Sequence, residues 1–169
     1  MHAPTPDFYS ILEIFSKYKV DFIIVGGVCG VLHGAPVTTF DLDIVHSRAE
    51  ENLARLLPAL KKLEAYYRGR QSQRLKPKLD DLSSPGHHLL MTRFGPLDLL
   101  GTIGAGEGYP NLLEQSDEIE IEKMRLRVLT LEKLIEVKEK LGSEKDKAVL
   151  PILRQTLLEK GKKRGRDRK

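Results

Sequence analysis

Two aspartates separated by a single residue lie in an alternating segment, and this pattern constrains the fold more than any other. Over residues 40–44, apolar side chains occupy every second position and Asp41 and Asp43 lie between them. A period of two is typical of a half-buried β-strand. Side chains two positions apart on a strand point to the same face, about 6.5 Å apart at ~3.3 Å rise per residue. The sequence therefore predicts a strand over about 39–45 that directs two carboxylates into one space.

This pair of acids indicates a site for a divalent metal and phosphate. Two negative charges in one space repel each other unless a cation lies between them. Carboxylate oxygens are hard ligands that suit Mg²⁺, which proteins commonly bind together with substrate phosphates. A glycine pair, Gly26-Gly27, precedes the two acids and follows the segment 21–25, which is apolar after Asp21, so we expect a tight turn from a buried strand into a helix.

A third acid repeats the same alternation further along the chain. Asp98 lies between Leu97 and Leu99 in an otherwise apolar segment. An acid in such a setting costs several kcal/mol unless it is paired or bound to a cation. If its strand lies beside the first at ~4.8 Å, three carboxylates converge on one face. That arrangement can hold two metal ions ~3.5–4 Å apart, one at the attacking hydroxyl and one at the leaving phosphate.

The periodicity elsewhere predicts a single α/β (α+β) domain, with a mixed sheet flanked by helices and a C-terminal helical pair. Helices are expected over about 7–18, 28–34, 48–66, 110–115, 130–141 and from 143 onward, and strands over about 21–25, 39–45, 87–92, 97–100 and within 119–128. Polar, basic residues 67–86 are expected to form a loop or a weak edge strand. Thr130 and Ser143 are predicted helix caps, and Pro151 is expected to break or kink the last helix. The domain is expected to span residues 1–159, with its core at about 7–128 and its helical part at about 130–159.

Composition narrows the class of protein. Hydrophobic residues make up 40% of the chain, which is enough for a core, and aromatic residues only 6%. The single cysteine, Cys29, excludes an intramolecular disulfide and fits a reducing compartment. The first residues lack the pattern of a secretory signal, and no stretch approaches the ~18 apolar residues of a membrane helix. We therefore expect a cytoplasmic protein with no membrane association.

The positive charge of the chain is concentrated at its end. Residues 160–169 hold seven basic side chains and one acid, a net +6, which leaves about −2 for the first 159 residues of a chain whose total is +4. A segment this polar cannot bury enough apolar area to order itself, so the sequence predicts a disordered basic tail. Two interpretations stay open, a merely solvated end and a segment that contacts nucleic acid.

Together, these motifs resemble the nucleotidyltransferase superfamily related to DNA polymerase β. The similarity is closest to the small bacterial branch of minimal nucleotidyltransferases and AbiEii-type toxins, where the segment commonly reads GG-x-A-x-x-x-HG-x-x-R-x-T-x-DLD. Matching residues here are Gly26, Gly27, His33, Gly34, Thr39, Asp41, Leu42 and Asp43. A later segment with Lys138, Lys145 and Asp146 resembles the Lys…Lys-Asp pattern of the same branch.

The resemblance implies transfer of a nucleoside monophosphate from an NTP to a hydroxyl acceptor, for example RNA, tRNA or protein. It implies two Mg²⁺ ions, replaceable by Mn²⁺, on the catalytic and metal-binding residues Asp41, Asp43 and Asp98. Asp98 would also help to deprotonate the acceptor hydroxyl. The residues expected at the nucleotide phosphates are Gly26, Gly27, Thr39, Lys138 and Lys145.

The chain departs from the family pattern at two places, and other functions stay open. Val37 stands where relatives often carry Arg, which removes a contact to phosphate or acceptor, and Cys29 stands where Ala is usual. One alternative is a catalytically inactive module that binds RNA or a protein partner, in a toxin–antitoxin pair or as a homodimer. Another is transfer to a small antibiotic-like acceptor.

Overall fold

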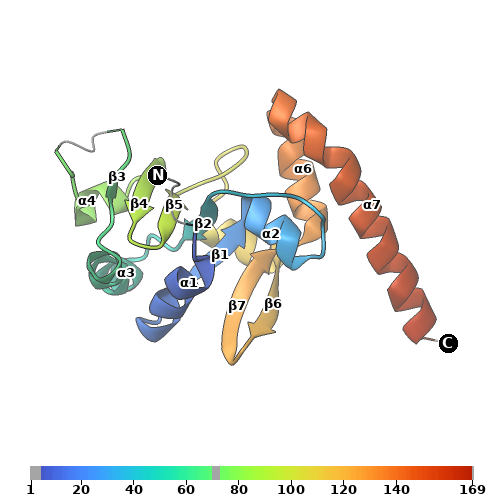
Figure 1. Cartoon of the computed structure of the whole chain (residues 1–169), viewed down its shortest axis with the longest axis horizontal. Coiled ribbons are helices and arrows are strands. Elements are labelled where there is room, and N and C mark those ends of the chain that lie inside the picture. The colour runs from blue at the N-terminus through green and yellow to red at the C-terminus, as the bar shows by residue number, and fades with distance from the viewer. Residues whose placement is uncertain (1–4, 70–72, 169) are drawn as a thin grey trace.

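The computed structural model describes residues 5–69 and 73–168, and its described strands form a mixed seven-stranded sheet (Figure 1). The strand order is β3-β4-β5-β2-β1-β7-β6. The strands are β1 (Phe22–Val25), β2 (Leu42–His46), β3 (Tyr66–Tyr67), β4 (His87–Thr92), β5 (Gly95–Leu100), β6 (Ser116–Ile121) and β7 (Met124–Leu129). The helices are α1 (Phe8–Lys17), α2 (Gly26–Leu32), α3 (Glu50–Lys62), α4 (Leu79–Leu82), α5 (Tyr109–Leu112), α6 (Leu131–Leu141) and α7 (Glu144–Asp167). None of these helices is both long enough and apolar enough to cross a membrane.

The centre of the sheet combines antiparallel and parallel pairs. β1 runs antiparallel to β2 and parallel to β7, while β2 runs parallel to β5. Six of the helices form two packed groups, α1 with α3 and α4, and α2 with α6 and α7, while α5 packs beside β1 (Figure 1). Aliphatic side chains of β1 and β2 are fully buried between the two groups, as at Ile23, Ile24 and Ile44. The predicted α/β fold class with a mixed sheet and a C-terminal helical pair is therefore confirmed.

Two predicted strands differ from the observed ones. β2 begins at Leu42 rather than at residue 39, so Asp41 lies just before the strand and Phe40 is 72% exposed instead of packed in the alternation. The region 119–128 forms two strands, because a hairpin turns at Glu122 and Lys123. Both turn residues have positive φ, 47° and 81°. A turn without glycine or proline carries no clear sequence signal, which is why local pattern does not reveal this hairpin.

The C-terminal segment also differs from expectation. α7 continues through Pro151, which was expected to break or kink it, and through residues 160–167, which were expected to be disordered. Leu150 and Leu153 bury the first half of α7 against the core. Once a packed turn exists, each further residue adds a hydrogen bond at a low entropic cost. The helix therefore continues into the polar segment, and one lost donor at Pro151 is tolerated.

Candidate active site

Three carboxylates meet beside the first residues that pair between β2 and β5. The parallel register places Asp43 directly opposite Asp98, and Asp41 lies one residue before β2. One oxygen from each of Asp41, Asp43 and Asp98 lies within 4.8 Å of the others, and all three residues are half-buried. Among the described residues, no other group of three His, Cys, Asp or Glu side chains converges in this way. The sheet register thus joins acids that lie on separate segments of the sequence.

The electrostatics of this cluster leave a negative charge to be neutralised. Burial, followed by the charge and hydrogen bonding of Asp98 and the charge of Asp41, raises the pKa of Asp43 from 3.8 to about 7, and Lys138 opposes the shift. Asp43 Oδ1 is buried and has no hydrogen-bond partner among the described residues. A buried oxygen without a partner is costly unless a proton or a cation satisfies it. Three carboxylates with an orphaned oxygen are a donor set that fits a hard divalent cation.

Arg68 orients the third carboxylate, and sequence reasoning missed this role. Its Nη2 donates to Asp98 Oδ1 at 2.7 Å, and its Nη1 donates to the Leu90 carbonyl at 2.6 Å. Both partners of the ion pair are largely buried, with 24% and 13% of the side chains exposed. The sequence predicted a loop or a weak edge strand over residues 67–86, but the strand pairing that brings Arg68 to Asp98 is not visible in a local pattern.

The glycine pair opens α2 against the same acids. Gly26 has a φ of +67°, a left-handed conformation that favours glycine. A Cβ on Gly26 would collide with Asp43 Oδ2, and one on Gly27 would lie 2.6 Å from Thr39 Oγ1. The missing side chains therefore let the start of α2 approach the acids. The first N–H groups of a helix have no partner within the helix, so this approach brings free donors beside the carboxylates.

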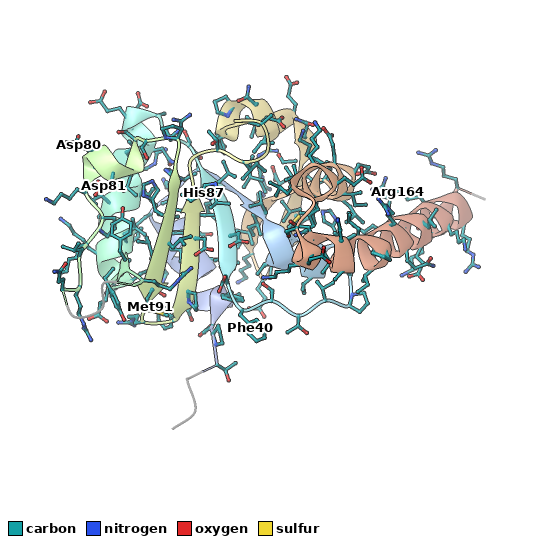
Figure 2. All side chains as sticks on the ribbon, turned by 90° about the horizontal axis from the view of Figure 1, so that it is seen from above. Phe40, Asp80, Asp81, His87, Met91 and Arg164 are labelled. Atoms are coloured by element: carbon teal, nitrogen blue, oxygen red, sulfur yellow. The ribbon has the colours of Figure 1, made fainter. Side chains whose placement is uncertain are left out.

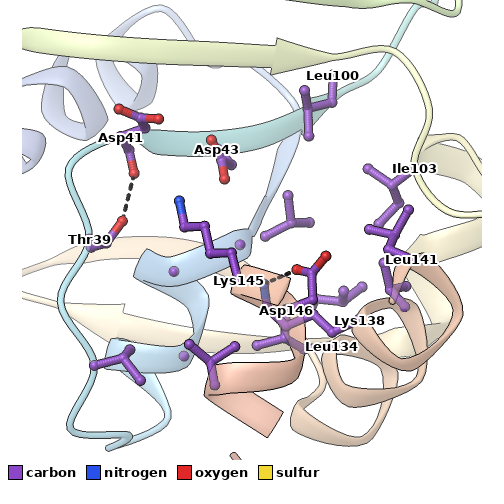
Figure 3. Close-up of a pocket in the computed structure, with 18 of the residues that line it drawn as sticks. Thr39, Asp41, Asp43, Leu100, Ile103, Leu134, Lys138, Leu141, Lys145 and Asp146 are labelled. Carbon is purple, nitrogen blue, oxygen red and sulfur yellow. Dashed lines mark hydrogen bonds and ion pairs between the residues drawn. The ribbon is translucent and has the colours of Figure 1, made fainter. Parts of the chain in front are cut away.

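Thr39 has a structural contact in the same region. Its hydroxyl donates to the Asp41 carbonyl at 3.0 Å (Figure 3). This bond holds the segment that leads into β2 and thus positions the backbone of Asp41. The hydroxyl proton of Thr39 is therefore already used in a hydrogen bond to the backbone of the site.

A cavity of about 490 Å³ adjoins the acids. Asp41 and Asp43 line one end, and Figure 3 shows the side chain of Lys145 pointing from α7 toward Asp43. Lys145 has no ion-pair partner among the described residues. Lys138 also lines the cavity, but its Nζ lies 3.2 Å from Asp146 Oδ1. Burial raises the pKa of Asp146, yet hydrogen bonds from Ser143 and Lys138 outweigh this and keep the pKa below its usual value.

The far end of the cavity is aliphatic. It is lined by side chains of β5, α6 and α7 and of the loop after β5, namely Leu100, Ile103, Leu134, Val137, Leu141, Val149 and Leu153. Figure 3 shows Leu100, Ile103, Leu134 and Leu141 among them. Val37, at the position where the family that the sequence resembles often carries arginine, lines the cavity as well. Phe40 stands exposed at the lip and points away from the body (Figure 2). The cavity therefore has a charged end at the acids and an apolar wall formed mainly by the two C-terminal helices.

Comparison with known proteins identifies the fold. No family model matches the sequence, and no curated protein does. Among solved structures, a candidate nucleotidyltransferase from Thermotoga maritima is 21% identical with a TM-score of 0.54, covering 90% of this chain and 91% of that one. The lincosamide antibiotic adenylyltransferase LnuA, with lincomycin bound, is 15% identical with a TM-score of 0.60, covering 88% of this chain and 95% of its own. The antibiotic-resistance factor ANT(2'')-Ia, in complex with adenylyl-2''-tobramycin, is 18% identical with a TM-score of 0.55, covering 89% and 87%. The chain thus has the nucleotidyltransferase fold.

Proposed function

We propose that this chain is a metal-dependent nucleotidyltransferase that transfers a nucleoside monophosphate from an NTP to a hydroxyl acceptor. The observation that carries the proposal is the meeting of Asp41, Asp43 and Asp98, the first two of which line one end of a cavity that the start of α2 also lines. The fold supports it, since the solved structures that share it include adenylyltransferases.

The three acids would hold two divalent ions, for which we propose Mg²⁺ with Mn²⁺ as a substitute. Bound metal would supply charge neutralisation at the phosphates and activation of the acceptor hydroxyl. The orphaned Asp43 Oδ1 supports this assignment, because a cation would satisfy a buried oxygen that has no hydrogen-bond partner among the described residues.

The remaining residues of the site would bind and orient the reactants. Asp98, held at Oδ1 by Arg68, would accept the proton of the acceptor hydroxyl. The backbone of Gly26 and Gly27 would approach the triphosphate, and Lys145 would neutralise its charge. Lys138 would contact phosphate only after breaking its ion pair with Asp146 on α7, so Lys145 is the better candidate of the two for binding phosphate.

For the acceptor, we propose a hydroxyl of RNA, tRNA or protein, as expected for a toxin-like enzyme. The small-molecule alternative has support of its own, because two solved structures of this fold contain lincomycin and an adenylylated tobramycin. The aliphatic wall of the present cavity offers no free carboxylate to a polycationic compound, since Asp146 is paired with Lys138. This favours an acceptor that is not a polycation.

Incubation with each α-labelled NTP, Mg²⁺ and either total RNA or soluble cell protein tests the proposal. We expect label in one acceptor fraction, and none with Asp41→Asn, while Asp80→Asn, an exposed acid of α4, serves as the matched control. If no NTP labels either RNA or protein, but the chain still binds NTP measurably, the result would instead favour the catalytically inactive binding module. Equal labelling by wild type and Asp41→Asn would refute the assigned site.

A further inference from the structure

The end of α7 extends away from the rest of the molecule (Figure 1). This part of the helix is rich in basic residues. All of residues 161–168 are exposed. Figure 2 places Arg164 on this extending part of the helix. Within residues 160–168, one acid, Asp167, accompanies the basic residues Lys160, Lys162, Lys163, Arg164, Arg166 and Arg168. The segment therefore presents a strong positive charge at a fixed place on the fold.

A hydrogen-bonded anchor sets the direction of this helix end. Lys160 Nζ donates to His33 Nδ1 at 2.6 Å, and His33 Nε2 donates to the Leu129 carbonyl at 2.7 Å. The three groups belong to α7, the end of α2 and the end of β7. Beyond this anchor, no described ion pair neutralises the basic side chains. The charges thus extend from a rigid base, which lowers the entropy lost when they bind a partner.

The charge density of the segment matches that of a nucleic acid. Six positive charges over eight helical steps of ~1.5 Å correspond to one charge per about 2 Å of axis. Duplex DNA carries one negative charge per ~1.7 Å of axis. At ~100° per residue, Lys162 and Arg166 project on the side opposite to Lys160 and Arg164. Positive groups on two sides of one helix can contact several phosphates at once.

The same segment is unsuited to a membrane surface. An interfacial helix needs an apolar face that enters the lipid, and the only uncharged residues within 159–168 are two glycines, Gly161 and Gly165. On the side facing the body, Asp117 and Glu132 line a small cavity together with Lys160 and Arg164. The charges most available to a partner are therefore Lys162, Lys163, Arg166 and Arg168.

We propose that residues 160–168 form a sequence-independent binding surface for the phosphate backbone of a nucleic acid. Arg166 lies about 20 residues beyond Asp146 at the cavity, about 30 Å along the helix. The surface is thus separate from the carboxylates, and the inference stands whether or not the chain transfers a nucleotide. Engagement of four or five phosphates predicts a slope of about −4 when the logarithm of the association constant is plotted against the logarithm of the salt concentration on a duplex.

Fluorescence anisotropy of the full chain with random-sequence oligonucleotides of about 20 residues tests the surface, in separate arms for single-stranded RNA, double-stranded RNA and duplex DNA. The test variant combines K162Q, K163Q, R166Q and R168Q. The control variant combines K17Q, K61Q, K62Q and K123Q, four exposed lysines elsewhere, so that both variants lower the net charge of +4 to zero. Glutamine keeps the helix, and circular dichroism checks that both variants fold.

We expect the test variant to lose about 100-fold or more in affinity at low salt and most of the salt slope, while the control loses about threefold or less. Equal losses in both variants would refute the surface, because net charge alone would then explain binding. Absence of binding by the wild type at low salt would refute it as well. Equally tight, tail-dependent binding to polyglutamate or to anionic vesicles would overturn the choice of nucleic acid as the partner.

Discussion

Replacing Asp43 by asparagine should stabilise the metal-free protein at neutral pH. Burial and the neighbouring acids raise the pKa of Asp43 from 3.8 to about 7. A group whose pKa is raised on folding favours the folded state fully below its unfolded pKa. That contribution is lost as the pH rises from about 4 through about 7. Above pH 7 the wild type therefore carries the cost of a buried charge, whereas the neutral amide of the D43N variant carries none.

The structure sets the size of this effect. The shift spans about three pKa units at ~1.36 kcal/mol each, an upper value of about 4 kcal/mol. Asp43 is half-buried rather than fully buried, and solvent screening reduces the cost. We expect D43N to gain about 2–3 kcal/mol in unfolding free energy at about pH 8 and close to nothing at about pH 4.

Urea unfolding in the presence of a chelator, at several values between about pH 4 and pH 8, measures the difference between D43N and wild type. D80N is the control, because Asp80 is an exposed acid whose removal should change stability little at any pH. Added Mg²⁺ should stabilise the wild type and leave D43N nearly unchanged, since the variant lacks one of the three carboxylates proposed to hold the metal. A D43N protein that is no more stable than wild type at the alkaline end of this range would refute the reasoning.

Three further outcomes follow from single contacts. G26A should destabilise the protein by about 1–3 kcal/mol in thermal unfolding and abolish NTP binding, because the added Cβ collides with Asp43. G34A is the control, since Gly34 also has a positive φ but has open space around it, and this variant should retain NTP binding. R68M should lower transfer at least about tenfold in a folded protein, with part of the activity regained in R68K, since the third carboxylate loses its fixed orientation. Burial lowers the pKa of His46 to about 4. The neutral side chain therefore contributes to the stability of the fold above about pH 6.5, and this contribution is lost as the pH falls toward 4. Over that range, urea unfolding should show the wild type losing about 3 kcal/mol of unfolding free energy relative to H46Q.

Local patterns determined the elements that carry the site. Alternation placed Asp43 and Asp98 on apolar strands, and the glycine pair marked the turn into α2. Thr130 caps α6 by accepting from the Lys133 N–H, as its position before the helix predicted. These features depend on neighbours within a few residues, where strand period, helix caps and glycine conformations are set by the local chain.

Tertiary structure alone decided how these pieces meet. The register that sets Asp43 opposite Asp98, and the pairing that brings Arg68 to Asp98, join segments tens of residues apart. Lys138 is engaged by Asp146, whereas Lys145 points into the cavity, although both are lysines of the same predicted motif. Strand periodicity predicts to which face of the sheet a side chain points, but not which strand lies beside its own. The sequence thus determined that Asp43 and Asp98 would lie on strands with Asp41 close by, and only the sheet order brought one oxygen of each within 4.8 Å of the others.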